Sequence, residues 1–460
     1  MKYKSLAIDH PKDLIFGYAP HTVKTRRGLT FGTGLVYPEL NFTLPPMQVS
    51  KDNLKPISDQ YRSIVHGALE RALDLHTNGL VFEFEALLEM TRHPEIGVEI
   101  VKVMNDVCEE FYHKYQLKSE IRLTPNDLRE FERPPRSRTS PLLDLMFELF
   151  DKGAKAGGDI LSIESTGGKE ISDDALMMCD IKASFFALAI LGVRDMKMLW
   201  KRIVEIARRN NRIAGGDTAC GFANTAMVLA EKKFIPKVFA ALIRVLSVVR
   251  TIVAHEEGAT GPDKDCGYEG PYLKAIAGIP ISMEGKTAAC AHFSPLGNIA
   301  AACADLWSNE SIQNIKLLAG MAPTVSYEQL EYDTRLMNQA IRNGKESILH
   351  FQKLLCDSDA FLDPQAFILT PKNIIHISKE IIKGEGHLEN AKNGCLKALD
   401  LMQEGVRSGS LKIEDKELVW ISSLRDEVAS IPVNEDAFIA QMMPLLDSSK
   451  FIPSEYGIFV

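Results

Sequence analysis

From about residue 60 onward, short apolar runs that end in polar or glycine-rich residues alternate with longer segments of helical periodicity. One helical stripe consists of Val238, Leu242, Val245 and Val249, at steps of four, three and four residues. The pattern predicts strands at 79–85, 119–123, 159–164, 184–191, 212–217, 251–255, 280–284 and 315–319. Eight strands separated by helices favour an α/β fold of the TIM (β/α)8 barrel type, and an open doubly wound sheet is the alternative.

The two ends of the chain have different patterns. Residues 1–60 are rich in glycine and proline, which predicts an irregular N-terminal extension that wraps the barrel. Residues 61–335 would then form the catalytic barrel. Beyond it the strand signal stops, and apolar stripes such as Ile374, Ile377 and Ile381 predict a helical C-terminal region over 336–460.

Composition narrows the class of protein. The net charge of −8 over 460 residues gives no basic footprint for nucleic acid. Residues 1–14 have no apolar core of the signal-peptide type, and the apolar run 183–193 is about half of the ~20 residues that span a bilayer. We therefore expect a cytoplasmic protein with no membrane segment. Its eight cysteines are then buried, metal-binding or nucleophilic rather than disulfide-bonded.

Three predicted strand ends carry side chains suited to chemistry: Glu164, Cys220 and Cys266, each within a glycine-rich segment. Their spacing fits the third, fifth and sixth strands of a barrel, and barrel enzymes build their sites at the carboxyl ends of the strands. Two thiolates and a carboxylate suit zinc and leave one position open for a substrate. The alternative is that both cysteines only pack in the core.

Other side chains are weaker candidates. Glu83 and Glu85 end the first predicted strand, and period-two alternation is expected to point one into the site and the other toward the barrel wall. Asp217 could orient a ligand, handle a proton or cap the following helix. His292 could be a ligand, a general acid or a hydrogen-bonded structural histidine.

Five segments together resemble the methanol:corrinoid methyltransferases. They are SIESTGGKE (162–170), GDTAC (216–220), GPDKDCGYE (261–269), SMEGKT (282–287) and WSNES (307–311). The resemblance implies a zinc-containing eight-stranded barrel, with Glu164, Cys220 and Cys266 as the zinc ligands. It also implies a homodimer and a separate small corrinoid-binding protein, in the methanol metabolism of anaerobic methanogens and acetogens. Relatives in the wider group demethylate other methylated compounds.

The resemblance implies a reaction in which the methyl group of methanol passes to the Co(I) corrinoid (cobalamin) of the partner. Zinc would act on the methanol oxygen as a Lewis acid. The proton for the leaving oxygen would come from Glu83, Glu85, Asp217 or solvent. In-line attack by cobalt requires the corrinoid protein to dock over the barrel mouth. Alternatives are demethylation of a methoxy compound or methylamine by the same chemistry, a zinc hydrolase, and a non-catalytic corrinoid-binding scaffold.

Overall fold

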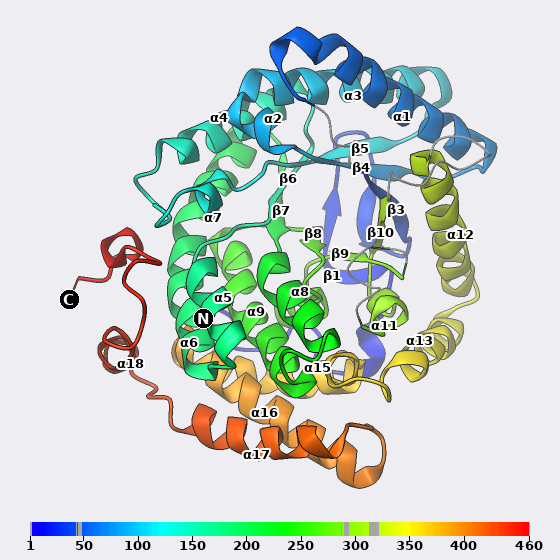
Figure 1. Cartoon of the computed structure of the whole chain (residues 1–460). Helices are drawn as coiled ribbons and strands as arrows, with labels where there is room; N and C mark the ends of the chain where they lie inside the picture. Colours follow the sequence, from blue (N-terminus) through cyan, green and yellow to red (C-terminus); the bar gives the residue numbers. More distant parts are fainter. Residues whose placement is uncertain are drawn as a thin grey trace.

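The computed structural model describes residues 2–459, except 43, 45–47, 287, 289–293 and 312–321. Its main sheet has eight parallel strands in the order β7-β6-β5-β4-β3-β10-β9-β8. The strands are β3 (Tyr37–Phe42), β4 (Leu80–Glu85), β5 (Ser119–Thr124), β6 (Ile160–Ile163), β7 (Ile213–Asp217), β8 (Asp263–Asp265), β9 (Ile281–Glu284) and β10 (Leu306–Ser311). The segment before β8 returns to β7, where Thr260 N donates to Ala214 O at 2.8 Å and Gly261 N donates to Gly215 O at 3.0 Å. These bonds join the two ends of the sheet, and the TIM barrel prediction is confirmed (Figure 1).

Helices surround the sheet and continue into a helical tail (Figure 1). Those between the strands are α1 (Leu54–Asp74), α2 (Leu88–Arg92), α3 (Pro94–Tyr115), α4 (Pro141–Ala156), α5 (Lys169–Met178), α6 (Ile181–Phe185), the π-helix η4 (Phe186–Gly192), α7 (Val193–Arg209), α8 (Cys220–Glu231), α9 (Lys237–Glu257), α10 (Gly270–Ala277) and α11 (Gly297–Ala301). After β10 come α12 (Ala322–Arg342), α13 (Lys345–Asp359), α14 (Pro364–Phe367), α15 (Pro371–Ile381), α16 (His387–Ser408), α17 (Asp415–Ala429) and α18 (Glu435–Met442).

Two strand predictions are wrong. Residues 184–191 lie in α6 and η4, and residues 251–255 are the last turns of α9. Every side chain from Val238 to His255 is buried, so this helix is enclosed on all sides. The predicted stripe of Val238, Leu242, Val245 and Val249 lies in it, but its last turns have no exposed polar face to mark them as helical. Among the described residues, α9 is the one helix long and apolar enough to cross a membrane, and its apolar window is wholly buried inside the protein.

Three barrel strands were missed: β3, β8 and β10. Strand β3 falls inside the range 1–60 that the sequence assigns to the extension, so the barrel begins earlier in the chain than expected. Strand β8 has the sequence Asp-Lys-Asp, which has none of the apolar character of a buried strand. The predicted strand at 315–319 lies outside the described residues.

The N-terminal hairpin of β1 (Tyr18–Lys24) and β2 (Thr30–Thr33) packs against the amino end of the barrel. In its turn, the buried Arg27 donates to Ser119 O at 3.0 Å and forms ion pairs of 3.0 Å with Glu120 and Asp159. Apolar residues of the hairpin and of the strands form a separate small core there: Val23, Leu29, Phe31, Tyr37, Val81, Ile160 and Leu306. The amino end is therefore filled, and the carboxyl end is left for a site.

Between this apolar layer and the carboxyl end of the strands, the barrel interior is polar. Buried Arg122 of β5 pairs with Glu39 of β3 and donates to Ser162 Oγ of β6 at 2.8 Å. One level closer to the carboxyl end, Lys264 of β8 lies 2.7 Å from Glu83 of β4. Buried charges are retained where they are paired. The Arg122 contacts join nearby strands, whereas the Lys264–Glu83 pair connects strands on opposite sides of the barrel.

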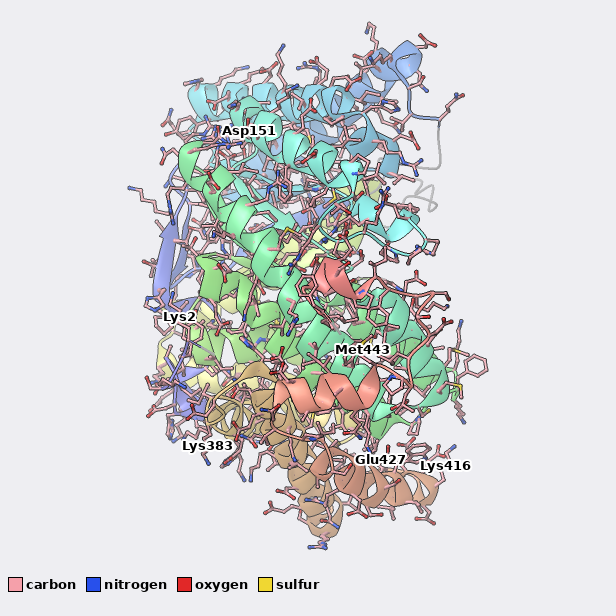
Figure 2. All side chains as sticks on the ribbon, turned by 90° about the vertical axis from the view of Figure 1, so that its left-hand side faces the viewer. Lys2, Asp151, Lys383, Lys416, Glu427 and Met443 are labelled. Atoms are coloured by element: carbon pink, nitrogen blue, oxygen red, sulfur yellow. The ribbon has the colours of Figure 1, made fainter. Side chains whose placement is uncertain are left out.

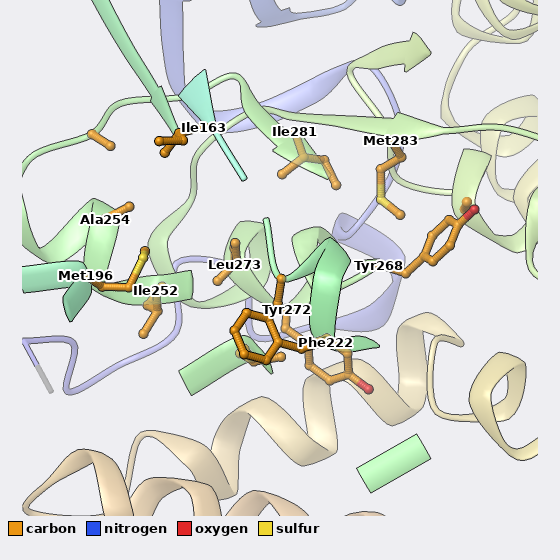
Figure 3. Close-up of a cluster of buried hydrophobic side chains, with 14 of the residues drawn as sticks. Ile163, Met196, Phe222, Ile252, Ala254, Tyr268, Tyr272, Leu273, Ile281 and Met283 are labelled. Atoms are coloured by element: carbon orange, nitrogen blue, oxygen red, sulfur yellow. The ribbon is translucent and has the colours of Figure 1, made fainter. Parts of the chain in front are cut away.

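Outside the barrel, apolar side chains from the strands and helices form one large core. Figure 3 shows a part of it, with side chains from β6, α7, α8, α9, α10 and β9 in one buried cluster. The tail helices run around the barrel, from α12 beside β3 and β10, through α16 beside α9, to α18 beside η4 (Figures 1 and 2). Near the C-terminus, Phe438 and Phe451 both contact the ring of Phe186 in η4, and Arg194 pairs with Glu435 at 2.7 Å.

Candidate metal centre

Glu164, Cys220 and Cys266 meet at the carboxyl ends of three neighbouring strands. Glu164 directly follows β6, Cys220 is the first residue of α8 after β7, and Cys266 directly follows β8. The sequence spacing had suggested the third, fifth and sixth strands. Because residues 184–191 are helical, the long segment between Glu164 and Cys220 is a single crossover, and β6, β7 and β8 are consecutive around the barrel.

One potential ligand atom from each of these residues lies within 4.8 Å of the other two. Cys266 Sγ is 3.7 Å from Glu164 Oε1. Cys266 is buried, whereas Glu164 and Cys220 are partly exposed. The group is therefore anchored in the protein on one side and open to the barrel mouth on the other.

The electrostatics of the site favour a bound cation. The hydrogen bond with Cys266 lowers the pKa of Cys220, but burial and the Glu164 carboxylate outweigh it and raise the pKa to about 12. Burial, the contact with Cys220 and the Glu164 carboxylate raise the pKa of Cys266 well above its ordinary range. A divalent cation between the three groups would reverse this balance, since it stabilises thiolates. The donor set of two sulfurs and one oxygen fits zinc.

Two side chains that sequence reasoning missed contact these groups. Asn224, one turn after Cys220 on α8, donates from Nδ2 to Cys220 Sγ at 3.2 Å. Lys264 Nζ lies 3.1 Å from Glu164 Oε1. An i, i+4 search from Cys220 would have found Asn224. Lys264 is two residues before Cys266, but nothing in the sequence shows that it points into the barrel.

Glu83 and Glu85 do not point to opposite sides of β4, as the sequence analysis expected, because residues two apart share one face of a strand. Glu83 is buried and accepts from Lys264 at 2.7 Å and Thr124 at 2.8 Å. Burial raises the pKa of Glu83, but Lys264 outweighs it, and the net shift is downward. Glu83 is thus held as a carboxylate in an ion pair.

Glu85 lies closer to the mouth. It lines a cavity of about 120 Å³ whose other lining residues come from the end of β5 and the segment that follows it, from the residues after β6, and from α5 and α8: Thr124, Pro125, Asn126, Asp127, Glu130, Glu164, Ser165, Thr166, Lys169 and Gly221. Burial and the neighbouring Asp127 carboxylate raise the pKa of Glu130. Glu85 and Glu130 are thus acidic groups that share a small cavity with Glu164.

Asp217 is fully buried at the end of β7. Its carboxylate accepts from Ser165 Oγ at 2.8 Å and Trp200 Nε1 at 2.9 Å, and it lies 3.4 Å from Arg250. Burial raises the pKa of Asp217 despite these partners. The structure therefore places this side chain behind the site, where it holds the residue next to Glu164. His292 lies outside the described residues.

The comparisons with known proteins agree with this geometry. Residues 1–457 match the model of the family described as methanol-cobalamin methyltransferase B subunit. The chain belongs to this family. It is 32% identical, over 99% of both chains, to the methanol–corrinoid protein co-methyltransferase of Methanosarcina barkeri. The crystal structure of the methanol:cobalamin methyltransferase complex from the same organism contains a chain that matches with a TM-score of 0.93 and 31% identity, over 99% of both chains.

The family comprises methyltransferases, so the resemblance seen in the sequence motifs is confirmed at the level of family and fold. The match extends through the N-terminal hairpin and the helical tail, beyond the barrel alone. Accordingly, the hairpin, barrel and tail correspond together to one chain of the solved complex.

Proposed function

We propose that this protein transfers the methyl group of methanol to the Co(I) corrinoid of a partner protein, with zinc held by Glu164, Cys220 and Cys266. The observation that carries the proposal is the convergence of these three side chains at the mouth of a barrel that matches the family along its whole length. The relative named methanol–corrinoid protein co-methyltransferase supports the choice of substrate and acceptor.

In the overall reaction, the carbon–oxygen bond of methanol breaks, the methyl group passes to cobalt, and the oxygen leaves with an added proton as water. Zinc would supply Lewis acidity toward the methanol oxygen. The side chains of this protein orient the metal ligands and hold the proton. Lys264 orients the Glu164 carboxylate, and Asn224 holds the Cys220 sulfur by its amide N–H. Glu85 and Glu130 are placed to hold the proton at the cavity, whereas Glu83 and Asp217 are occupied by buried partners.

The cavity beside Glu164 supports a small substrate. Its volume of about 120 Å³ is well below the ~300 Å³ at which pockets for drug-sized ligands begin. Methanol and methylamine are small enough for such a space, and a methoxylated aromatic ring would fill most of it. The size of the cavity therefore favours methanol over the larger methylated substrates used elsewhere in the wider group.

We further propose that the corrinoid protein docks over the carboxyl end of the barrel, since cobalt must reach the methyl carbon directly and the amino end is filled by the β1–β2 hairpin. Such a cover excludes water during the transfer. We also propose that the enzyme is a homodimer and that it is located in the cytoplasm. The cysteines of the described residues are all free thiols, as a reducing compartment requires.

The test is methyl transfer itself. The zinc content of the purified protein is measured, and the corrinoid spectrum is followed when methanol is added to the protein with a reduced Co(I) partner. We expect one zinc per chain and conversion of Co(I) to methyl-Co(III). Undiminished transfer by Cys266→Ala would refute the role of zinc, and transfer only from a methoxy compound or methylamine would refute methanol as the substrate.

A further inference from the structure

The two cysteine-bearing loops are joined by a reciprocal pair of hydrogen bonds. The first loop runs from the end of β7 to Cys220, and the second from Cys266 to Glu269. Gly267 N donates to Thr218 Oγ1 at 3.1 Å, and Ala219 N donates to Glu269 Oε1 at 2.6 Å. Each loop thus offers a side-chain acceptor to a backbone N–H of the other, and we name this pair of bonds the loop clasp.

Glu269 is the more constrained half of the loop clasp. Its side chain is fully buried, and the same Oε1 atom accepts from Thr251 Oγ1 of α9 at 2.8 Å. Ala219 is the residue before α8, and it provides no side-chain cap for that helix. A carboxylate placed at the first N–H groups of a helix satisfies an unpaired donor and interacts favourably with the helix dipole. Glu269 therefore fixes where α8 begins.

The position of that helix start decides where one thiol lies. Cys220 is the first residue of α8 and directly follows Ala219, whose N–H is bonded to Glu269. Cys266 directly precedes Gly267, whose N–H is bonded to Thr218. Each sulfur is thus one residue away from a bond to the opposite loop, although the loops come from different strands.

We propose that Glu269 is a positioning residue that sets the separation between Cys220 and Cys266, so that one ion can bind both sulfurs. That this separation serves to bind a metal ion rests on the proposed function, but the separation itself can be measured in the metal-free protein. The role differs from that of a general stabilising contact, because it depends on a carboxylate or amide oxygen at this one position. A glutamine keeps that oxygen, and a leucine of similar size does not.

The experiment uses phenylarsine oxide on the metal-free full-length protein. Its trivalent arsenic takes two thiols, forms two As–S bonds and releases its oxygen as water with the two thiol protons. The wild-type protein, Glu269→Gln, Glu269→Leu and Cys266→Ala are compared by intact mass and by the rate of adduct formation. Asp305→Asn is the matched control, since Asp305 is an equally buried carboxylate that bonds Lys274 and Ile281 N at the amino end of the barrel.

We expect bridged adducts in the wild-type protein, Glu269→Gln and Asp305→Asn, and none at this site in Cys266→Ala. In Glu269→Leu, bridging slows and zinc affinity measured by competition with a chelator falls by about 10–100-fold, as for the loss of other groups that orient metal ligands. Both thiols of that variant still react singly with an alkylating reagent. If Glu269→Leu does not fold, Thr218→Val removes the other bond of the loop clasp together with the 3.9 Å contact between Thr218 Oγ1 and Cys266 Sγ, and the same loss is expected.

Two outcomes would overturn the inference: bridging and zinc affinity in Glu269→Leu equal to the wild type, or equal losses in Glu269→Gln and Glu269→Leu. A wild-type protein that captures the arsenical but binds no zinc would refute the proposed function. The role of Glu269 in placing the thiols would still stand in that case, so the two failures can be told apart.

Discussion

At the scale of single residues, the site depends on charges that the barrel buries in pairs. Lys264 contacts Glu83 at 2.7 Å and Glu164 at 3.1 Å. Burial lowers the pKa of Lys264, but the carboxylates of Glu83 and Glu85 outweigh it and raise the pKa well above the ordinary range. The ammonium group therefore stays charged, and it joins the barrel interior to one of the candidate metal ligands.

Removal of this lysine should leave Glu83 buried without its cation. We expect Lys264→Met to lower the free energy of unfolding by about 3–5 kcal/mol. The double variant Lys264→Met/Glu83→Gln should regain most of that loss, because a neutral amide can still accept from Thr124. Chemical denaturation of the single and double variants measures both values. A double variant as unstable as the single one would contradict this account.

His255 predicts a specific dependence of stability on pH. Burial lowers the pKa of His255 from 6.5 to about 4, and its ring lies 3.4 Å from Asp263, whose pKa burial raises well above its ordinary range. The remaining neighbours are Ala259 O at 3.1 Å and the carboxylates of Asp217 and Glu256. The folded state thus favours the neutral imidazole.

Because the pKa of His255 is lower in the folded state than in the unfolded state, the contribution of His255 to the free energy of unfolding is complete above pH 6.5. It is lost as the pH falls from 6.5 to about 4, and its full value is about 3 kcal/mol. We expect His255→Gln to flatten the fall in unfolding free energy over this window. Denaturant titrations at several pH values measure it, and parallel curves for variant and wild type would argue against the assignment.

At the scale of elements, the β1–β2 hairpin is held to the barrel by one buried arginine. Arg27 faces the buried carboxylates of Glu120 and Asp159, whereas its neighbour Arg26 is 37% exposed. We expect Arg27→Met to cost about 3–5 kcal/mol, since it leaves the buried Glu120 without its cation and removes one of the two arginines that pair with Asp159. Arg26→Met should cost about 1 kcal/mol or less. Thermal unfolding of both variants measures the difference, and equal losses would contradict the role given to Arg27.

The composition and burial of each element also explain whether it could be predicted from the sequence. Strands β4, β6, β7 and β9 were found because each begins with an apolar residue and ends at or just before a polar one, and β5 because Ile121 and Leu123 alternate with polar residues. Strands β8 and β10 were missed because the barrel interior is polar at their level, so their sequences resemble loops. Helix α9 and the π-helix η4 were mistaken for strands in part because they are buried on all sides.

The convergence of the three candidate metal ligands could be predicted because each lies in a short glycine-rich motif next to a strand. Their supporting residues could not. Lys264 and Glu269 act through contacts with Glu164 and Ala219, which lie far away in the sequence. Such contacts exist only after the strands have been placed in order, and that order was itself misjudged between β6 and β7.

At the scale of the whole molecule, the proposed docking of the partner over the barrel mouth rests on the filled amino end and the candidate site at the carboxyl end. Lys169 lines the cavity beside Glu164 and pairs with Asp173 at 2.6 Å. We expect bound corrinoid protein to reduce acetylation of Lys169 several-fold. Lys383, which pairs with Glu380 at 2.7 Å at the end of α15, should be labelled equally with and without the partner (Figure 2).

Mass spectrometry after brief acetylation gives both values in one experiment. Equal labelling of Lys169 in the free and bound enzyme would contradict docking over the barrel mouth. Protection of Lys383 instead would place the partner on the tail side of the molecule.

We propose above that Glu164, Cys220 and Cys266 hold one zinc ion at the barrel mouth. Zinc K-edge X-ray absorption on the purified protein tests it most directly. We expect two sulfur neighbours at about 2.3 Å and oxygen neighbours at about 2.0–2.2 Å, with one sulfur lost in Cys266→Ala. A zinc ion surrounded only by nitrogen and oxygen, or two sulfurs that persist in Cys266→Ala, would contradict it.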